Sequence, residues 1–280
     1  MIAANTGFLF QELPFLERIG AAARAGYDAI EFHDEAQREK EDDVRAALRD
    51  AGLPLLGLNT RMGETVGLAG RPGREAEARE QIEEALSLAG ALGGRAVHVL
   101  AGLREDDASS QPSAEAWMAY RDNLVWACDR SDGLRVLIEP LSARAMPGYV
   151  LDSLSRAASL VEWVARPQLE IMFDVFHVAS GAGEPSTGPG GATSPIGSAT
   201  DLASACGRYA RHVGHVQLAD PDSRGAPRID GPFAVGAMIE ALRMAGYEGA
   251  FGAEYREDER DAPPSAWLAT AREAASRPVR

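Results

Sequence analysis

Residues 135–140 read RVLIEP, a short apolar run that ends on Glu139, and three later runs end in the same way. These three are LEIMFD (169–174), ending on Asp174, VGHVQL (213–218), with Gln217, and GAFGAEY (249–255), with Glu254. Successive polar residues are roughly 40 positions apart, about the length of one strand and one helix of a parallel barrel. In such a barrel the carboxyl ends of the strands converge on one mouth, where catalytic sites are built. We therefore expect the four side chains to meet.

Short β-like runs alternate with longer amphipathic runs along the whole chain. The candidate strands are Ile2 to Ala4, Ala29 to Phe32, Leu53 to Leu58, Ala96 to Leu100, Arg135 to Ile138, Leu169 to Phe173, His212 to Leu218 and Ala250 to Glu254. The runs between them repeat apolar residues at i, i+3 and i+4, and several end in Gly, the usual helix C-cap. This alternation predicts an α/β fold, as one (β/α)8 TIM barrel spanning residues 1–280. An open doubly wound sheet has the same periodicity, but the converging polar strand ends favour closure.

Composition excludes several classes of protein. The chain has 280 residues, 45% of them apolar, and a net charge of −14, which argues against nucleic-acid binding. Its start, MIAANTGFLF, has no basic region and no long apolar run follows, so we expect no membrane segment and a cytoplasmic protein. Cys128 and Cys206 lack metal-ligand spacing and suit core packing. Lys40 is the only lysine and lies in a charged stretch, which makes Schiff-base and pyridoxal chemistry improbable.

Three carboxylates and an amide that point at one another need a positive partner. Oxygen ligands suit a hard divalent cation, so Glu139, Asp174, Gln217 and Glu254 predict one metal site. We expect Mg²⁺ or Mn²⁺, with Co²⁺ or Zn²⁺ as alternatives. Taken singly, each residue has a simpler interpretation: Glu139 as a helix cap or surface acid, for example, and Gln217 as a partner of a backbone group. The four together favour the metal.

Two further segments lie outside the repeating pattern. Residues 180–200 read SGAGEPSTGPGGATSPIGSAT, which is rich in Gly, Pro and Ser and predicts a flexible loop. Because it follows the sixth strand it emerges at the mouth, either as a tolerated insertion or as a lid over the substrate. The tail 258–280 predicts a surface helix with a frayed end.

Several segments together resemble the hydroxypyruvate isomerase group of the xylose-isomerase-like (β/α)8 superfamily. They are AANTGFLFQELPFLERIGAAARAGYDAIEF, AGRPGREAEARE, RAVHVLAG, LIEPLSARAMPGYVL, FDVFHV, GHVQLADPDSR and GAEYRE. The resemblance covers roughly residues 1–256, and each piece falls at the expected strand end. It implies a metal-dependent isomerase with a small-molecule substrate, and relatives of this kind often pair into homo-oligomers.

The resemblance also implies roles for individual residues. It assigns Glu139 and Glu254 to metal binding and to the acid/base pair, and Asp174 and Gln217 to the metal. His177, three residues after Asp174, and Arg224 match substrate-binding positions. Asn5, Glu31, Asn59 and His98 fall near the mouth, and we count Asn59 and His98 among the substrate-binding candidates. From the residues alone, His98 and His215 lie in apolar runs, where a core histidine bonded to a backbone carbonyl is the simpler interpretation.

The specificity loops depart from the family pattern. After Arg224 the family usually continues with His-Glu-Pro, whereas this chain reads GAPRID and places Arg228 at the glutamate position. Arg61 replaces a small or apolar residue; it is either a second anion-binding group or a solvent-exposed side chain. These differences suggest retained enolisation chemistry on an altered substrate.

We therefore expect an isomerase that acts on a small hydroxy-oxo acid or sugar through an enediolate. The default reaction converts hydroxypyruvate to tartronate semialdehyde, with Glu139 and Glu254 moving the proton. A ketose 3-epimerase and an inosose-dehydratase-like lyase would use similar metal and glutamate chemistry, and both are alternatives to this reaction. A non-catalytic small-molecule-binding barrel is a further alternative. The superfamily also contains endonucleases of abasic DNA, but five scattered histidines and the net charge of −14 argue against that function.

Overall fold

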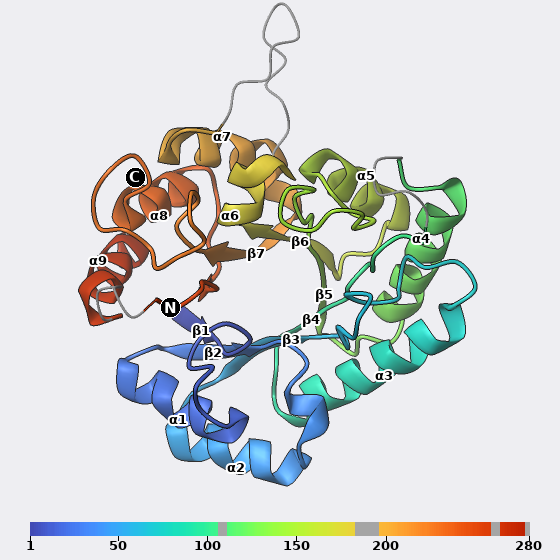
Figure 1. The fold of residues 1–280 in the computed structure, drawn as a ribbon, viewed down its shortest axis with the longest axis horizontal. Coiled ribbons are helices and arrows are strands. Elements are labelled where there is room, and N and C mark those ends of the chain that lie inside the picture. Colours follow the sequence, from blue (N-terminus) through green and yellow to red (C-terminus); the bar gives the residue numbers. More distant parts are fainter. Residues whose placement is uncertain (106–110, 183–195, 259–263, 278–280) are drawn as a thin grey trace, which may run out of the picture.

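Eight parallel strands form a closed barrel in sequence order, so that β1 pairs with both β2 and β8 (Figure 1). The computed structural model describes residues 1–105, 111–182, 196–258 and 264–277. The strands are β1 (Ile2–Asn5), β2 (Ala29–Phe32), β3 (Leu55–Asn59), β4 (Ala96–His98), β5 (Arg135–Ile138), β6 (Leu169–Asp174), β7 (Val213–Leu218) and β8 (Phe251–Ala253). The predicted (β/α)8 barrel is confirmed, and every predicted strand is present within two residues at either end.

Helices surround the barrel as an outer ring (Figure 1). They are α1 (Phe15–Ala25), α2 (Glu41–Ala51), α3 (Glu75–Ala91), α4 (Ala114–Cys128), α5 (Leu154–Val164), α6 (Val175–His177), α7 (Ala199–Tyr209), α8 (Val235–Met244) and α9 (Ser265–Ser276). Short helical turns span Ala36–Arg38 (η1), Val178–Ala182 (η2) and Ala210–His212 (η3). Within the described ranges, no helix combines the length and the apolar character that crossing a membrane requires.

Local sequence signals set the ends of these helices. Gly26 and Gly52 follow α1 and α2 with φ angles of 93° and 68°, a left-handed conformation that glycine adopts at little cost. At the other end, the side chains of Ser113 and Ser198 accept a backbone N–H in the first turn of α4 and α7. These caps define where α1 and α2 end and where α4 and α7 begin.

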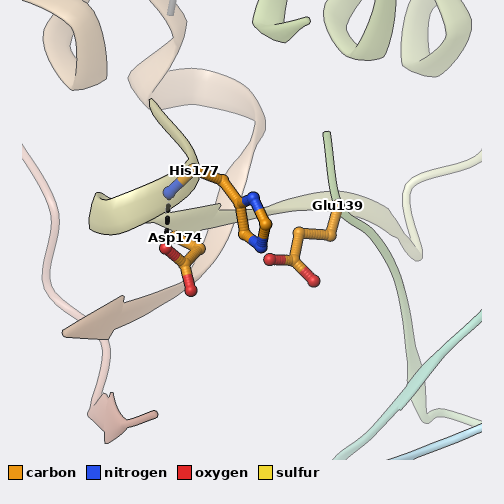
Figure 2. Close-up of side chains that lie close together, drawn as sticks. All are labelled: Glu139, Asp174 and His177. Atoms are coloured by element: carbon orange, nitrogen blue, oxygen red, sulfur yellow. Dashed lines mark hydrogen bonds between the residues drawn. The ribbon is translucent and has the colours of Figure 1, made fainter. Parts of the chain in front are cut away.

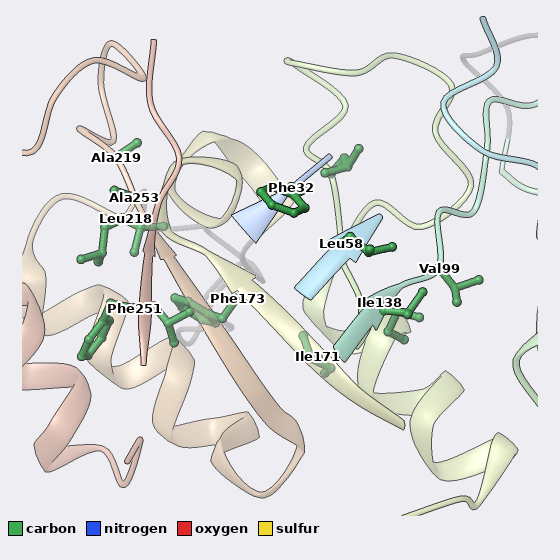
Figure 3. Close-up of a cluster of buried hydrophobic side chains, with 14 of the residues drawn as sticks. Phe32, Leu58, Val99, Ile138, Ile171, Phe173, Leu218, Ala219, Phe251 and Ala253 are labelled. Carbon is green, nitrogen blue, oxygen red and sulfur yellow. The ribbon is translucent and has the colours of Figure 1, made fainter. Parts of the chain in front are cut away.

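The main hydrophobic core lies between the barrel strands and the surrounding helices (Figure 3). Phe32, Leu58, Ile138, Ile171 and Phe173 alternate along their strands with residues that point into the barrel, and all five are buried. Burial of a large apolar side chain stabilises the fold by about 1.5–3 kcal/mol. This packing holds the strand ends, and hence the mouth, in fixed positions.

The tail forms the predicted helix, α9, which completes the ring; its outer face is exposed, but its inner face is buried more deeply than the sequence suggested. Trp267 is 1% exposed, and its ring lies 6.2 Å from that of Tyr27 and 6.1 Å from that of Tyr255. The helix therefore contributes a buried aromatic cluster beside β1 and β8. Of the predicted loop at 180–200, residues 183–195 lie outside the described residues; the flanks belong to η2 and α7.

Several side chains in the barrel interior below the mouth are small. Ala3, Ala29 and Leu56 form one small cluster, and Ala96, Leu137 and Met172 form another. Barrels of this type are ordinarily filled by bulky branched side chains. Here a cavity of about 430 Å³, which we call the bore, lies beside small residues such as Gly57, Ala96 and Gly214. Asn5, Glu31, Asn59, His98 and Gln217 line it toward the mouth, and Arg95, Gly133 and Ala250 line it toward the amino ends of the strands.

Candidate metal centre and active site

Polar side chains form a ring at the carboxyl ends of the strands. The register places Asn5 beside Glu31, Asn59 beside His98, and Asp174 beside Gln217. Glu139 and Glu254 follow the last residues of β5 and β8, and each is 5% exposed. Since every one of these side chains is buried, the ring carries a concentration of carboxylates that would be unstable without positive or hydrogen-donating partners.

Glu139, Asp174 and His177 come closest to a metal site (Figure 2). One candidate ligand atom from each residue lies within 4.8 Å of the others. The buried Oε1 atoms of Glu139 and Gln217 have no hydrogen-bond partner, which is costly unless a cation or another donor approaches them. The oxygen-rich donor set suits a hard divalent cation. The residues present therefore fit the predicted metal.

His177 is arranged as a hydrogen-bond donor and not as a metal ligand. Its Nδ1 lies 3.2 Å from the backbone N–H of Ser142, which can only donate, so Nδ1 must be the unprotonated nitrogen. Burial, together with the charge of Arg224, lowers the pKa of His177 to about 3, so the ring is neutral. Because Nδ1 is unprotonated and the ring is neutral, the single ring proton is on Nε2. A protonated nitrogen cannot ligate a metal.

Asp174 holds the start of the short helix that carries His177. Its Oδ1 accepts the backbone N–H of His177 at 2.9 Å, the usual N-cap contact, and Figure 2 shows this bond. One carboxylate thus fixes the turn that aims the imidazole toward Glu139.

Glu254 is surrounded by donors on both of its oxygens. His33 Nε2 lies 2.9 Å and Asn5 Nδ2 lies 3.3 Å from Oε1, while Arg224 donates to Oε2 at 3.0 Å. Burial by itself would raise the pKa of Glu254, but the bond from His33 and the charge of Arg224 outweigh it and lower that pKa. Glu254 is therefore ionised.

Glu139 and Asp174 experience the opposite environment. Burial raises the pKa of both carboxyl groups, and the nearby charge of Glu254 raises them further, to about 8 for Asp174. Two carboxyl groups whose pKa values are pushed apart, here Glu139 and Glu254, are the usual arrangement for dividing acid and base roles. A bound cation would ionise Glu139 and Asp174 as well.

Arg224 is clamped between two aromatic rings. Its guanidinium carbon lies 4.4 Å from the ring centroid of Phe8 and 5.0 Å from that of Phe176. Such cation–π contacts contribute about 0.5–2 kcal/mol each and hold the planar group in one orientation. The buried Nε atom has no hydrogen-bond partner, so this donor is available to a substrate oxygen.

The loop that carries Arg224 differs from the family pattern but is well anchored. Asp220 accepts the N–H groups of Asp222 and Ser223, and Arg228 forms ion pairs with Asp220 and Asp222. Arg224 itself adopts a φ of 59°, a strained value for a residue with a side chain. Arg228 therefore stabilises the loop that carries Arg224.

Arg61 is not brought to the metal cluster. Its guanidinium binds Glu84 of α3 with two contacts, Nε to Oε2 at 2.6 Å and NH2 to Oε1 at 2.5 Å. The Nε and NH2 donors of this guanidinium are both used by one carboxylate, so they are not available to bind a substrate anion in the same way. The Arg61 side chain is 37% exposed, which agrees with the solvent-exposed alternative, and its ion pair with Glu84 anchors it to α3.

Asn59 and His98 line the bore just below the mouth. His98 Nδ1 lies 3.8 Å from Glu139 Oε2, and burial lowers the pKa of this histidine to about 3, so it is neutral. His215 lies 2.8 Å from the Glu31 carboxylate and not against the backbone carbonyl that we expected. Glu31 also accepts a hydrogen bond from Gln217.

From the sequence we expect His33 either at the surface or behind the residues of the site, and the structure places it against Glu254; the sequence did not predict the contacts of Glu31. His33 follows β2 by one residue, in EFHD, and this position after a strand is the local signal that could have identified it. Its ring packs so closely on Gly7 that a Cβ there would lie 2.2 Å from ring atoms. Gly7 is therefore required for His33 to reach Glu254.

Comparison with known proteins shows the family of the chain. The family model of xylose isomerase-like TIM barrels matches residues 19–276. The chain is 32% identical to a 2-oxo-tetronate isomerase of Cupriavidus necator over 95% of this chain and 96% of that protein. It is also 32% identical to a putative hydroxypyruvate isomerase of Mus musculus, over 95% of this chain and 93% of that protein.

A solved structure shows the same architecture. The crystal structure of an AP endonuclease, family 2, from Brucella melitensis superposes with a TM-score of 0.78 and 30% identity, covering 96% of this chain and 97% of that one. Similarity of this extent spans the whole barrel, including all the strand ends described above.

Proposed function

Because the chain belongs to the family of xylose isomerase-like TIM barrels, and because its curated relatives are named as isomerases, we propose that it isomerises a small hydroxy-oxo acid with the help of one divalent cation. The prediction of an isomerase is confirmed by these relatives. The substrate that we propose has three or four carbons, with hydroxypyruvate as the default and 2-oxo-tetronate as the alternative suggested by the Cupriavidus protein's name.

A single observation carries the proposal of metal dependence. The candidate ligand atoms of the buried carboxylates of Glu139 and Asp174 lie within 4.8 Å of each other. Gln217, the strand neighbour of Asp174, has a buried Oε1 with no hydrogen-bond partner. We propose Glu139, Asp174, Gln217 and Glu254 as ligands. When bound, the cation would polarise the substrate carbonyl and stabilise the negative charge that develops on the enediolate oxygens.

The chemistry asked of the protein is a proton transfer between neighbouring carbons. One glutamate removes the proton from the carbon that bears the hydroxyl, and the electron pair left behind forms the double bond of the enediol. The other glutamate supplies a proton to the former carbonyl carbon. The proton of the old hydroxyl passes to the old carbonyl oxygen as the new carbonyl forms, so the product is an isomer of the substrate, and the two glutamates return to their starting protonation states by exchange with solvent. No oxidant or reductant is consumed, in keeping with the role of Glu139 and Glu254 as the only reacting side chains.

The remaining side chains hold the substrate. We propose that the clamped guanidinium of Arg224 binds the substrate carboxylate, since its fork matches two carboxylate oxygens and its Nε is unpaired. Neutral His177 would donate from Nε2 to a substrate oxygen at the centre of the site. Both groups orient the substrate without competing for protons, because their pKa values lie far from neutrality in opposite directions.

Abasic-site endonuclease activity is disfavoured by the donor set of the candidate metal group found among the described residues, which has two carboxylates and one imidazole. A multi-zinc site needs several imidazoles at one place. His212 lies near Glu162, and His215 faces Glu31. Among the described residues that could hold a metal, the one group found contains a single histidine, His177.

A substrate panel tests the proposed function. We expect purified protein with Mg²⁺ or Mn²⁺ to interconvert a three- or four-carbon hydroxy-oxo acid, because the Arg224 guanidinium supplies a carboxylate receptor. The panel contains hydroxypyruvate, 2-oxo-tetronate, ketoses and inososes, read by NMR in D₂O. Turnover of ketoses alone would favour the 3-epimerase, dehydration of inososes the lyase, and binding without turnover the non-catalytic barrel; each of these results contradicts the proposal.

Arg224→Lys is expected to weaken substrate binding more than catalysis. Lysine keeps the charge but not the planar fork that Phe8 and Phe176 clamp, and a charge-assisted hydrogen bond contributes about 1.5–3 kcal/mol. KM should therefore rise by roughly 10- to 100-fold, with a smaller change in kcat. Steady-state kinetics with Arg121→Lys as matched control tests this, since Arg121 also lies over an aromatic ring, that of Trp163, and pairs with a carboxylate, Asp122, but does so on the outer helix α4. An unchanged KM would remove Arg224 from the substrate site.

A further inference from the structure

The amide of Gln217 has two chemically different ends, and only its oxygen can bind a cation. Its Nε2 lies 3.2 Å from Oε2 of Glu31, and its Oε1 is buried with no hydrogen-bond partner. An ionised carboxylate accepts hydrogen bonds but cannot donate them, so Glu31 must face the NH₂ end of the amide. The oxygen is thereby turned away from Glu31.

Glu31 lies against residues of β7 and β8, across the barrel from β2. Its Oε1 is 2.8 Å from Nε2 of His215 on β7, two residues before Gln217, a close contact that lacks the geometry of a hydrogen bond. On β8, a Cβ added to Gly252 would lie 2.5 Å from Oε1 and 2.6 Å from Oε2. The carboxylate therefore occupies the space that a side chain at position 252 would need, and the absence of one lets it reach Gln217.

Packing does not fix the amide, because Gln217, Glu31 and His215 all line the bore. A cavity of about 430 Å³ beside the amide leaves room for it to rotate about its last torsion. The hydrogen bond to Glu31 is thus the contact that distinguishes the two orientations. Without this hydrogen bond, water in the bore could stabilise either orientation of the Gln217 amide.

We propose that Glu31 is a positioning residue that orients Gln217 so that its Oε1 faces the cation. This inference rests on the proposed metal site and adds to it an outer partner drawn from β2, a strand that supplies no ligand. His215 and Gly252 support the same arrangement by fixing the carboxylate of Glu31.

The test measures Mn²⁺ affinity directly by calorimetry in the absence of substrate. Loss of an outer partner of a metal ligand typically lowers metal affinity about 10- to 100-fold, so Glu31→Ala should do the same. Gln217→Glu provides the decisive background, because both ends of a carboxylate are oxygens and orientation no longer matters. In the Q217E background, Glu31→Ala should leave affinity unchanged or raise it, since it also removes a like charge.

Two further variants separate positioning from general damage. Glu170→Ala is the matched control: Glu170 is a partly buried glutamate that pairs with Arg135 at the amino ends of the strands, and its loss should not change affinity. Gly252→Ala keeps every proposed ligand and displaces the Glu31 carboxylate, so it should lower affinity as Glu31→Ala does. Gly252→Ala also serves if Glu31→Ala does not fold.

The outcomes distinguish this inference from the proposed function. If the unmodified protein binds no divalent cation, the metal site fails and the inference fails with it. If the unmodified protein binds Mn²⁺ and Glu31→Ala binds equally well, only the inference is overturned. An equal loss of affinity in both backgrounds would assign Glu31 a structural role and would also overturn it.

Discussion

Asp174→Ala is expected to abolish divalent-cation binding and, with it, isomerase activity. A metal-replete sample of the unmodified protein should contain about one divalent ion per chain, held by oxygen ligands at the strand ends. Removal of Asp174 takes away a ligand and also the N-cap of the turn that carries His177. The affinity for Mn²⁺ should fall more than about 100-fold, beyond the effect of losing an outer partner.

Metal analysis and calorimetry measure this directly, and two variants sharpen the result. Asp174→Asn keeps a side-chain oxygen that can cap His177 but carries no charge, so the turn should persist while metal affinity drops. Asp28→Ala removes an acid that pairs with Arg272 just before β2, at the opposite end of the barrel, and should leave metal content unchanged. Unaltered metal content in Asp174→Ala would refute the site.

Glu254→Gln is expected to lower turnover by about 10²- to 10⁴-fold, the usual contribution of a positioned acid or base. The amide has nearly the shape of the carboxylate but cannot accept a proton from carbon. Incorporation of deuterium from D₂O into the substrate should stop, while substrate binding should change only modestly. Exchange at the unmodified rate would show that Glu254 does not move the proton.

The design of this experiment depends on the partners of Glu254. His33, Asn5 and Arg224 all donate to its oxygens, so a glutamine must direct its NH₂ group at one donor and some loss of stability is expected. A thermal melt of the variant accounts for that loss. Glu248→Gln changes an exposed glutamate just before β8 and should leave both exchange and stability unaltered.

Much of the fold and part of the site could be predicted because they depend on local patterns. An apolar run of strand length that ends in a polar residue can be recognised within six residues, and LEIMFD became β6 with Asp174 at its end. The repeat of such runs predicted the closed barrel. Closure then places Asp174 beside Gln217 through the strand register.

Contacts between distant residues could not be predicted in this way. Asn5 and Glu254 are 249 positions apart, and Glu31 and Gln217 are 186 apart. Arg61 likewise lacked any local sign that Glu84, on α3, would occupy its guanidinium. Each of these pairings depends on side-chain reach across the barrel, which no periodicity encodes.

The sequence by itself determined which side chains reach the mouth, because strand length and alternation decide where each run ends and which face its residues occupy. The tertiary structure alone decided what those side chains can do there. It lowers the pKa of Glu254 through His33 and Arg224, raises the pKa of Glu139 and Asp174 through burial, and assigns the proton of His177 to Nε2 through Ser142. Protonation and hydrogen-bond direction depend on the field and the partners at a point in space, and these exist only once the barrel has closed.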